Sequence, residues 1–194
     1  GALAIEPKPV TVTITGHKAS AVYDGQEHSV SGYDAVANEE LYNKDSIGFS
    51  GTGTITETDV GTYPMGLQET DFSNSDNNFD VTFIVTDGEL KITPVDAVIV
   101  TITGHKKTVT YNGSEQTVTG YEVEISNSLY TVDDFKFTGN AVAAGTDVAV
   151  YPMGLSEAQF ANTNDNFKNV EFVIIDGALA IEPKPVTVTI TGHK

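Results

Sequence analysis

The chain has 194 residues, with 39% hydrophobic and 19% charged residues, no cysteine and a formal net charge of −17 at pH 7. This composition is typical of a folded protein, and the missing cysteine excludes disulfides, thiolate metal sites and cysteine nucleophiles. The negative charge argues against nucleic acid and anionic membrane partners, and no apolar stretch reaches the roughly 20 residues that a membrane-spanning helix needs.

The sequence repeats itself with a period of 88 residues, because the tripeptide Gly-His-Lys begins at positions 16, 104 and 192. Residues 177–194 are also identical to residues 1–18. A fixed period of this size indicates tandem domains. We predict that residues 1–9 are the closing strand of a preceding repeat, 10–97 repeat domain 1, 98–185 repeat domain 2, and 186–194 the opening strand of a following repeat.

Each repeat begins with a strand of regular alternation. Val10, Val12 and Ile14 alternate with threonines, and residues 98–102 repeat the pattern with Val, Val and Ile. Such alternation predicts a half-buried strand whose aliphatic face points into the core. Asp-Gly at 24–25 and Asn-Gly at 112–113 follow, and these dipeptides favour a type I′ hairpin turn.

The middle of each repeat predicts two more strands, near residues 47–56 and 62–66 in the first copy and 135–142 and 150–154 in the second. Residues 67–72 and 155–160 carry Glu, Gln and Ala enough for one helical turn, and they are too short for a stable helix. Loops rich in Asn and Asp come next. A closing hairpin is then predicted, with its turn at Asp87-Gly88 in one copy and Asp176-Gly177 in the other.

Prolines lie where one repeat meets the next, at Pro7, Pro9, Pro94, Pro183 and Pro185. A connection of a few residues that contains proline is stiff. We therefore predict that neighbouring repeats stack end to end as a semi-rigid rod. The strand sequences at both ends of the chain have unpaired edges there, so we expect them to fray or to pair with another molecule.

The aromatic residues recur at the repeat spacing, since all eight tyrosines form pairs 88 residues apart. Core packing explains such pairs more simply than a ligand platform does, and the chain has no tryptophan to stack on a sugar. His17, His105 and His193 are one position seen three times, and no second histidine lies at metal-ligand spacing. We predict a structural or surface role for the histidines.

Acidic pairs raise the possibility of glycoside hydrolysis, which needs two carboxylates across a cleft. Glu39-Glu40 becomes Asn127-Ser128 in the other copy, and Asp133-Asp134 corresponds to Asp45-Ser46. Neighbours on a strand point to opposite faces, so these pairs indicate solvated surface charges. We predict no enzyme activity and no catalytic residues.

Calcium is the more serious ligand to consider, because Asp76, Asn77 and Asn78 and residues 164–166 offer oxygen atoms in loops. The EF-hand spacing and its distal glutamate are missing, and Asn and Asp also form turns by bonding their own backbone. We assign no cofactor-binding and no metal-ligating residue, and calcium stays open as an alternative for these loops.

The order of several short motifs resembles the mostly-β, glycine-rich MBG and YDG repeat modules of bacterial surface proteins. The motifs are Tyr-Asn-Gly at 111–113, Gly-Tyr at 120–121, Tyr-Pro-Met-Gly-Leu at 151–155, Asn-x-Asn-Phe at 164–167 and Asp-Gly-x-Leu-x-Ile at 176–181. The likeness covers both repeats. It implies an extracellular, adhesin-like protein attached to the bacterial cell wall, in which these modules form a stalk, and it carries over no catalytic residues.

The predicted fold is all-β, with two tandem immunoglobulin-like β-sandwich repeats of about seven strands each. A β-grasp-like sheet with one short helix is the alternative. The predicted function is a non-catalytic spacer, with adjacent repeats of the same protein as partners and a monomer as the expected state. The alternative is that the repeats themselves bind a host glycan or protein, with or without calcium.

Overall fold

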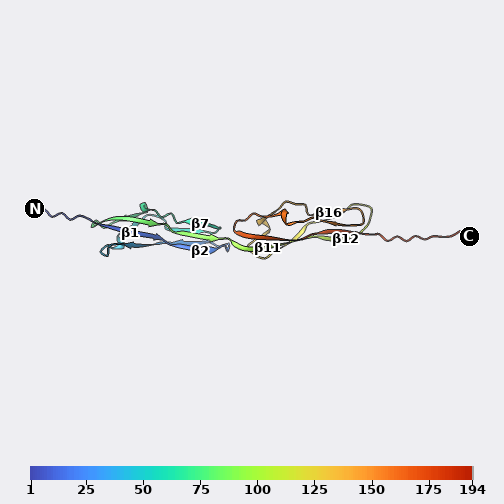
Figure 1. Cartoon of the computed structure of the whole chain (residues 1–194), viewed down its shortest axis with the longest axis horizontal. Coiled ribbons are helices and arrows are strands. Elements are labelled where there is room, and N and C mark those ends of the chain that lie inside the picture. Colours follow the sequence, from blue (N-terminus) through green and yellow to red (C-terminus); the bar gives the residue numbers. More distant parts are fainter. Residues whose placement is uncertain (194) are drawn as a thin grey trace. The chain divides into compact units, whose positions relative to one another are not determined.

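The computed structural model describes residues 1–193, which are built of strands joined by turns and by four short 3-10 helices within that range. The chain divides into two compact units, Gly1–Val95 (unit 1) and Asp96–Lys194 (unit 2). Their strands follow the same order, and Figure 1 labels several of them. The predicted all-β class is confirmed. That residues 10–97 and 98–185 fold independently stays a prediction.

Unit 1 contains ten strands in order along the chain. They are β1 (Lys8–Gly16), β2 (Lys18–Val22), β3 (His28–Ser31), β4 (Tyr33–Ala37), β5 (Ile47–Phe49), β6 (Thr54–Glu57), β7 (Gly61–Pro64), β8 (Phe72–Asn74), β9 (Phe79–Thr86) and β10 (Glu89–Thr93). The 3-10 helices η1 (Lys44–Ser46) and η2 (Glu69–Asp71) precede β5 and β8.

Unit 2 repeats this order. Its strands are β11 (Val95–Gly104), β12 (Lys106–Thr110), β13 (Gln116–Thr119), β14 (Tyr121–Ile125), β15 (Phe135–Phe137), β16 (Val142–Gly145), β17 (Val150–Pro152), β18 (Phe160–Asn162), β19 (Phe167–Ile175) and β20 (Ala178–Glu182). The 3-10 helices η3 (Val132–Asp134) and η4 (Glu157–Gln159) precede β15 and β18.

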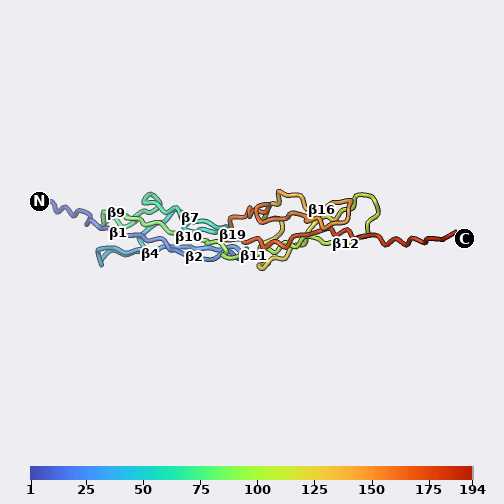
Figure 2. Tube along the Cα trace, turned by 45° about the vertical axis from the view of Figure 1, so that its right-hand side comes forward, coloured from blue at the N-terminus to red at the C-terminus, as the bar shows by residue number. Residues whose placement is uncertain are grey.

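Four small sheets form each unit. In unit 1 their strand orders are β4-β1-β9, β2-β10-β7, β3-β6 and β5-β8, and unit 2 has the equivalent set. The central strand β1 pairs parallel with β9 and antiparallel with β4, while β10 pairs parallel with β2 and antiparallel with β7. Figure 2 shows β9 beside β1 and β10 beside β2.

The sheets face one another as in a β-sandwich. Tyr33 of β4 contacts Phe49 of β5 and Phe72 of β8, with ring centroids 5.1 and 5.0 Å apart, so the β5-β8 sheet packs on the β4-β1-β9 sheet. Strands β3 and β6 pack in the same way against β10. The predicted core face is confirmed, because Val12 and Ile14 are fully buried.

Both predicted hairpins are wrong. Strands β2 and β3, on either side of Asp24-Gly25, belong to different sheets, and so do β9 and β10 around Asp87-Gly88. Of the first turn only Gly25 has a positive φ, of 74°, whereas a type I′ turn needs two such residues. The dipeptides are real turn signals, and they turn the chain from one sheet to another.

The predicted helical turns are confirmed as single 3-10 turns, η2 and η4. The predicted strand at 47–56 is two strands, β5 and β6, which lie in different sheets, and the equivalent segment of unit 2 divides into β15 and β16 in the same way. Strands β8 and β18 are not predicted, because each is only three residues long and follows directly on a 3-10 turn.

Residues 1–7 and 183–193 form no strand in the part of the chain that the structure describes, and Leu3 and Ile190 are 87% and 90% exposed. That residues 1–9 and 186–194 are strands of a preceding and a following repeat stays a prediction. Strand β1 begins at Lys8, so the last two residues of the predicted segment 1–9 belong to the first strand of unit 1.

Unit 2 holds one extra residue in each of two strands. Strands β11 and β19 are each one residue longer than their equivalents β1 and β9. Ala97 and Asn169 have φ angles of 60° and 54°, the left-handed conformation typical of a bulge, and the Asn169 Nδ2 donates to Asp96 Oδ1 at 2.7 Å. The two extra residues therefore lie side by side on β11 and β19, so both strands gain one residue at the same place.

Two glycines meet where both long strands change sheets. β1 continues into β2 after Gly16, and β9 continues into β10 after Gly88. A Cβ atom at Gly16 would lie 2.6 Å from the Gly88 Cα, and one at Gly104 would lie 2.7 Å from the Gly177 Cα. The two backbones therefore touch, and neither position can hold a side chain without displacing the other strand.

We predict that Gly16→Ala destabilises unit 1 by about 3 kcal/mol, because overpacking against a backbone cannot relax through a side chain. The measurement is urea unfolding followed by the NMR signals of unit 1. The matched control is Gly192→Ala, at the same place in an identical sequence but with open space around it. Equal effects of the two substitutions would contradict the contact.

Candidate functional site

In each unit an aspartate carboxylate accepts hydrogen bonds where a long strand passes from one sheet into the next, a point that we call the sheet crossing. Asp87 Oδ2 accepts the backbone N–H of Gly66 at 3.0 Å, and Oδ1 accepts those of Leu67 and Gly88 at 2.9 and 2.8 Å. Asp176 binds the equivalent segment of unit 2 through Gly154, at 3.0 Å. Both oxygens of each carboxylate hold backbone amides, so these aspartates tie the β9–β10 crossing to the segment after β7.

The histidine that follows each crossing is held by a backbone carbonyl. Nδ1 of His17 lies 2.8 Å from the Ser31 oxygen, and Nδ1 of His105 lies 2.7 Å from the Thr119 oxygen. A carbonyl can only accept, so Nδ1 carries the proton in each ring. Nε2 of His17 faces the exposed Asp34 at 3.6 Å. The same arrangement in both units joins the β1–β2 crossing to the end of β3 or β13.

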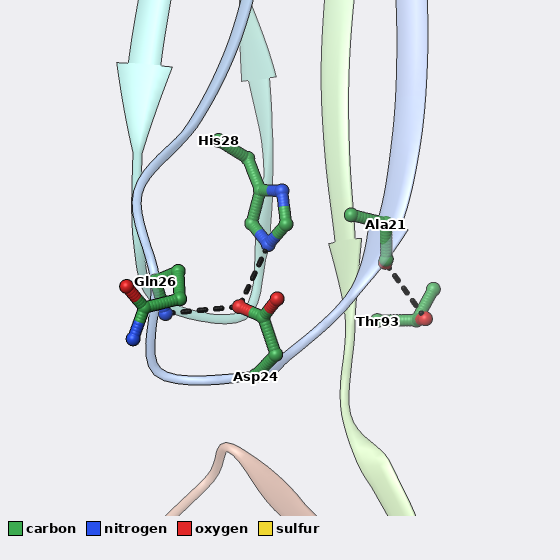
Figure 3. A network of polar contacts seen from close by, with 5 residues as sticks. All are labelled: Ala21, Asp24, Gln26, His28 and Thr93. Carbon is green, nitrogen blue, oxygen red and sulfur yellow. Dashed lines mark hydrogen bonds and ion pairs between the residues drawn. The ribbon is translucent and has the colours of Figure 1, made fainter.

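Figure 3 shows a second polar network, in the turn between β2 and β3. Asp24 Oδ1 accepts the Gln26 N–H at 2.9 Å and contacts His28 Nε2 at 3.0 Å. The Gln26 N–H and the His28 ring together lower the pKa of the Asp24 carboxyl. In unit 2 Asn112 accepts the Ser114 N–H instead, at 2.9 Å, so the turn bond is shared and the histidine contact is not.

Each of the two acidic pairs singled out from the sequence contains a carboxyl group with a lowered pKa. Glu39 makes an ion pair with Lys8, and this hydrogen bond lowers the pKa of its carboxyl. Burial raises the pKa of Asp134, but bonds from Asn164 and Thr131 outweigh it and the net pKa is lowered. A glycosidase general acid needs a raised pKa, which neither group has.

The Asn- and Asp-rich loops use their oxygens internally. Asp76 Oδ1 accepts both the backbone N–H and the side-chain amide of Asn78, each at 2.9 Å. Asn164 Oδ1 accepts the Asn166 N–H at 2.9 Å. In residues 1–193 no group of three His, Cys, Asp or Glu side chains is placed to hold a metal ion. Asn side chains and backbone carbonyls are calcium ligands as well, so calcium stays an open alternative for these loops.

One tyrosine of each unit is buried beside these loops. The Tyr130 hydroxyl, on a side chain that is 2% exposed, donates to Asp134 O and Asn162 Oδ1, both at 3.0 Å. Burial, together with the Asp134 carboxylate, raises the pKa of Tyr130 to about 12. Tyr42 bonds Asn74 Oδ1 at 3.1 Å, and burial raises its pKa in the same direction.

Most of the remaining aromatic rings pack on one another. In unit 1 Phe72 lies 5.7 Å from Phe83, and in unit 2 Phe160 lies 4.7 Å from Phe137, measured between ring centroids. These pairs join the two layers of each unit, where ring contacts add to the apolar burial. They are core residues, in agreement with the prediction.

A hollow with a volume of about 440 Å³ lies at the start of unit 1. Its lining is Glu6, Pro7, Asn77, Phe79 and Asp80. A neighbouring hollow of about 290 Å³ shares four of these residues. The polar lining of both hollows consists of acidic and amide side chains, joined by Lys8 in the second.

The fold and the polar contacts together define an all-β repeat module. Its conspicuous aspartate and histidine side chains bind the module's own backbone. Residues 98–192 match the family model of the MBG domain, so this part of the chain is an MBG-type module. No curated protein and no solved structure matches the chain. Within the described residues, no helix is long and apolar enough to span a membrane.

We predict that Asp87→Ala destabilises unit 1 by about 2–3 kcal/mol, because three backbone amides lose a charged acceptor. Asp176→Ala should do the same to unit 2 and leave unit 1 unchanged. Urea unfolding with unit-specific NMR signals measures both. Asp80→Ala, on the exposed face of β9, is the control. A loss at Asp80 as large as at Asp87 would contradict the role of the carboxylate.

Alkaline titration should identify Tyr130 as the last tyrosine to ionise. An unfolded tyrosine has a pKa near 10, and the folded value is about 12. The stability from this group is complete below pH 10 and is lost as the pH rises through 12. Absorbance at 295 nm should lose its latest step in Tyr130→Phe and keep it in Tyr111→Phe. A latest step that survives in Tyr130→Phe would contradict the assignment.

Proposed function

We propose that the chain is a pair of non-catalytic spacer repeats from the stalk of an adhesin-like protein on a bacterial cell surface. In this proposal the repeats are extracellular, and the protein is attached to the cell wall. The MBG match of residues 98–192 supports a repeat module of this kind. The observation that carries the proposal is that equivalent residues, an aspartate and a histidine in each unit, bind the backbone of their own unit.

Polar satisfaction also supports a spacer. Among the described residues, no buried side-chain nitrogen or oxygen lacks a hydrogen-bond partner. A binding or catalytic site commonly keeps polar groups that only a ligand satisfies. A stalk needs the opposite, a module whose polar groups are all satisfied internally.

The covalent joint between the units fits this function. β10 ends at Thr93 and β11 begins at Val95, so Pro94 is the single residue between two strands. Proline fixes its own φ and restricts the residue before it. A joint with so few free torsions would limit the swing of consecutive repeats, which is what a projecting stalk requires.

Solution X-ray scattering tests the spacer directly. We expect a pair-distance distribution with a long tail, as for a rod of two units. A variant with Gly-Ser-Gly-Ser inserted after Pro94 should broaden that distribution, because a flexible linker replaces the stiff joint. A compact distribution, or one that the insertion leaves unchanged, would contradict the proposal.

The alternative function is tested by titration against a glycan panel, with and without calcium. A spacer should give no heat in isothermal calorimetry under either condition. Saturable binding that Asp76→Ala or Asp165→Ala abolishes would instead favour repeats that bind a ligand through the Asn- and Asp-rich loops.

A further inference from the structure

Unit 2 carries the one asparagine of the sequence that is followed directly by glycine. Asn112 and Gly113 lie in the turn between β12 and β13, and both are exposed. Gly113 has a φ of 78°, and a Cβ atom built there would have only the Tyr111 hydroxyl oxygen within reach, at 4.0 Å. Asparagine is one of the thermolabile residues of proteins, so this open turn is a candidate for chemical change.

We propose that Asn112 is a modification site, at which the folded turn converts the asparagine to an acid without an enzyme. The backbone nitrogen of Gly113 forms a bond to Cγ of Asn112 and loses its proton, and the side-chain nitrogen leaves as ammonia. The resulting cyclic imide then takes up one water molecule at either of its two carbonyl groups. The product is aspartate or isoaspartate. This inference goes beyond the spacer function and does not depend on it.

The turn prepares the side chain for this attack. The Ser114 N–H donates to Oδ1 of Asn112 at 2.9 Å, and this bond closes a short ring that contains both reacting atoms, Cγ of Asn112 and N of Gly113. The two atoms are thereby held in one conformation, which reduces the entropy lost in reaching the reactive geometry. As the nitrogen adds to Cγ, negative charge develops on Oδ1, where the Ser114 N–H stabilises it.

A second asparagine of unit 2 has the same hydrogen bond and lacks the glycine. Asn127 Oδ1 accepts the Leu129 N–H at 2.9 Å, and Ser128 is the residue between them. The Cβ atom of a serine restricts the backbone and hinders the approach of its nitrogen to the preceding side chain, whereas glycine allows a close approach. Asn112 should therefore react before Asn127, although both side chains are held in the same way.

Unit 1 shows that this turn accepts the acid. Asp24 occupies the equivalent place, Gly25 follows it with a φ of 74°, and Asp24 Oδ1 accepts the Gln26 N–H at 2.9 Å (Figure 3). The aspartate product in unit 2 can therefore keep the hydrogen bond from Ser114. Isoaspartate adds a carbon atom to the backbone and changes the turn. Either product adds one negative charge to the connection between β12 and β13.

The test follows the side-chain amides of the full chain during storage in mildly alkaline buffer. One tryptic peptide, residues 108–136, contains both Asn112 and Asn127, because its last residue is its only lysine and it has no arginine. We expect Asn112 to lose its amide about tenfold faster than Asn127, since glycine leaves the approach open. Mass spectrometry with fragmentation locates the change, and chromatography separates the aspartate and isoaspartate forms of the peptide.

Two comparisons decide whether the folded turn is responsible. Asp24→Asn places an asparagine before Gly25 in the equivalent turn of unit 1, and we expect it to lose its amide at a rate similar to that of Asn112. In a chain unfolded with guanidinium chloride, Asn112 should react no faster than in the folded chain. Equal rates at Asn112 and Asn127 would overturn the proposal. So would an Asp24→Asn variant that keeps its amide, or an Asn112 that reacts faster once the chain is unfolded.

Discussion

Each unit depends on the contact of two backbones at one level. The strand pair β1 and β9 leaves one sheet and enters another as β2 and β10, and the two chains touch through Gly16 and Gly88. The parallel pairing is continuous across both sheets only because no Cβ separates the strands there. Unit 2 makes the same contact through Gly104 and Gly177, so the constraint belongs to the module.

Polar residues gather at this level because a sheet crossing interrupts the hydrogen-bond ladder. Amides that lose a strand partner need another acceptor, since a buried unpaired amide costs about 1–3 kcal/mol. Asp87 and the backbone oxygen of His17 supply acceptors in unit 1, the latter to the Glu89 N–H at 3.1 Å. The positions of His17 and Asp87 beside the glycine contact are therefore explained by the backbone amides that they bind.

Sequence reasoning succeeded where a pattern is local and failed where pairing is remote. Alternation around Val12 depends on one strand, and it predicted the buried face correctly. Asp-Gly at 87–88 predicted a turn, but a dipeptide carries no information on whether its flanking strands pair with each other. β9 pairs with β1, some 70 residues away. The polar roles of Asp87 and His17 follow from that same crossing, and the sequence shows only that both residues recur in the second unit, as Asp176 and His105.

Neighbouring repeats share a fold and nevertheless differ in strand length, and this difference has a physical consequence. The extra residues around Ala97 and Asn169 lie near the start of β11 and β19. Beyond them Val98, Val100 and Ile102 are buried as Val10, Val12 and Ile14 are in unit 1. The pairing of β11 with β14 also keeps the register of β1 with β4. A bulge in each of two strands therefore lets a unit gain residues without turning the buried face of its first strand toward solvent.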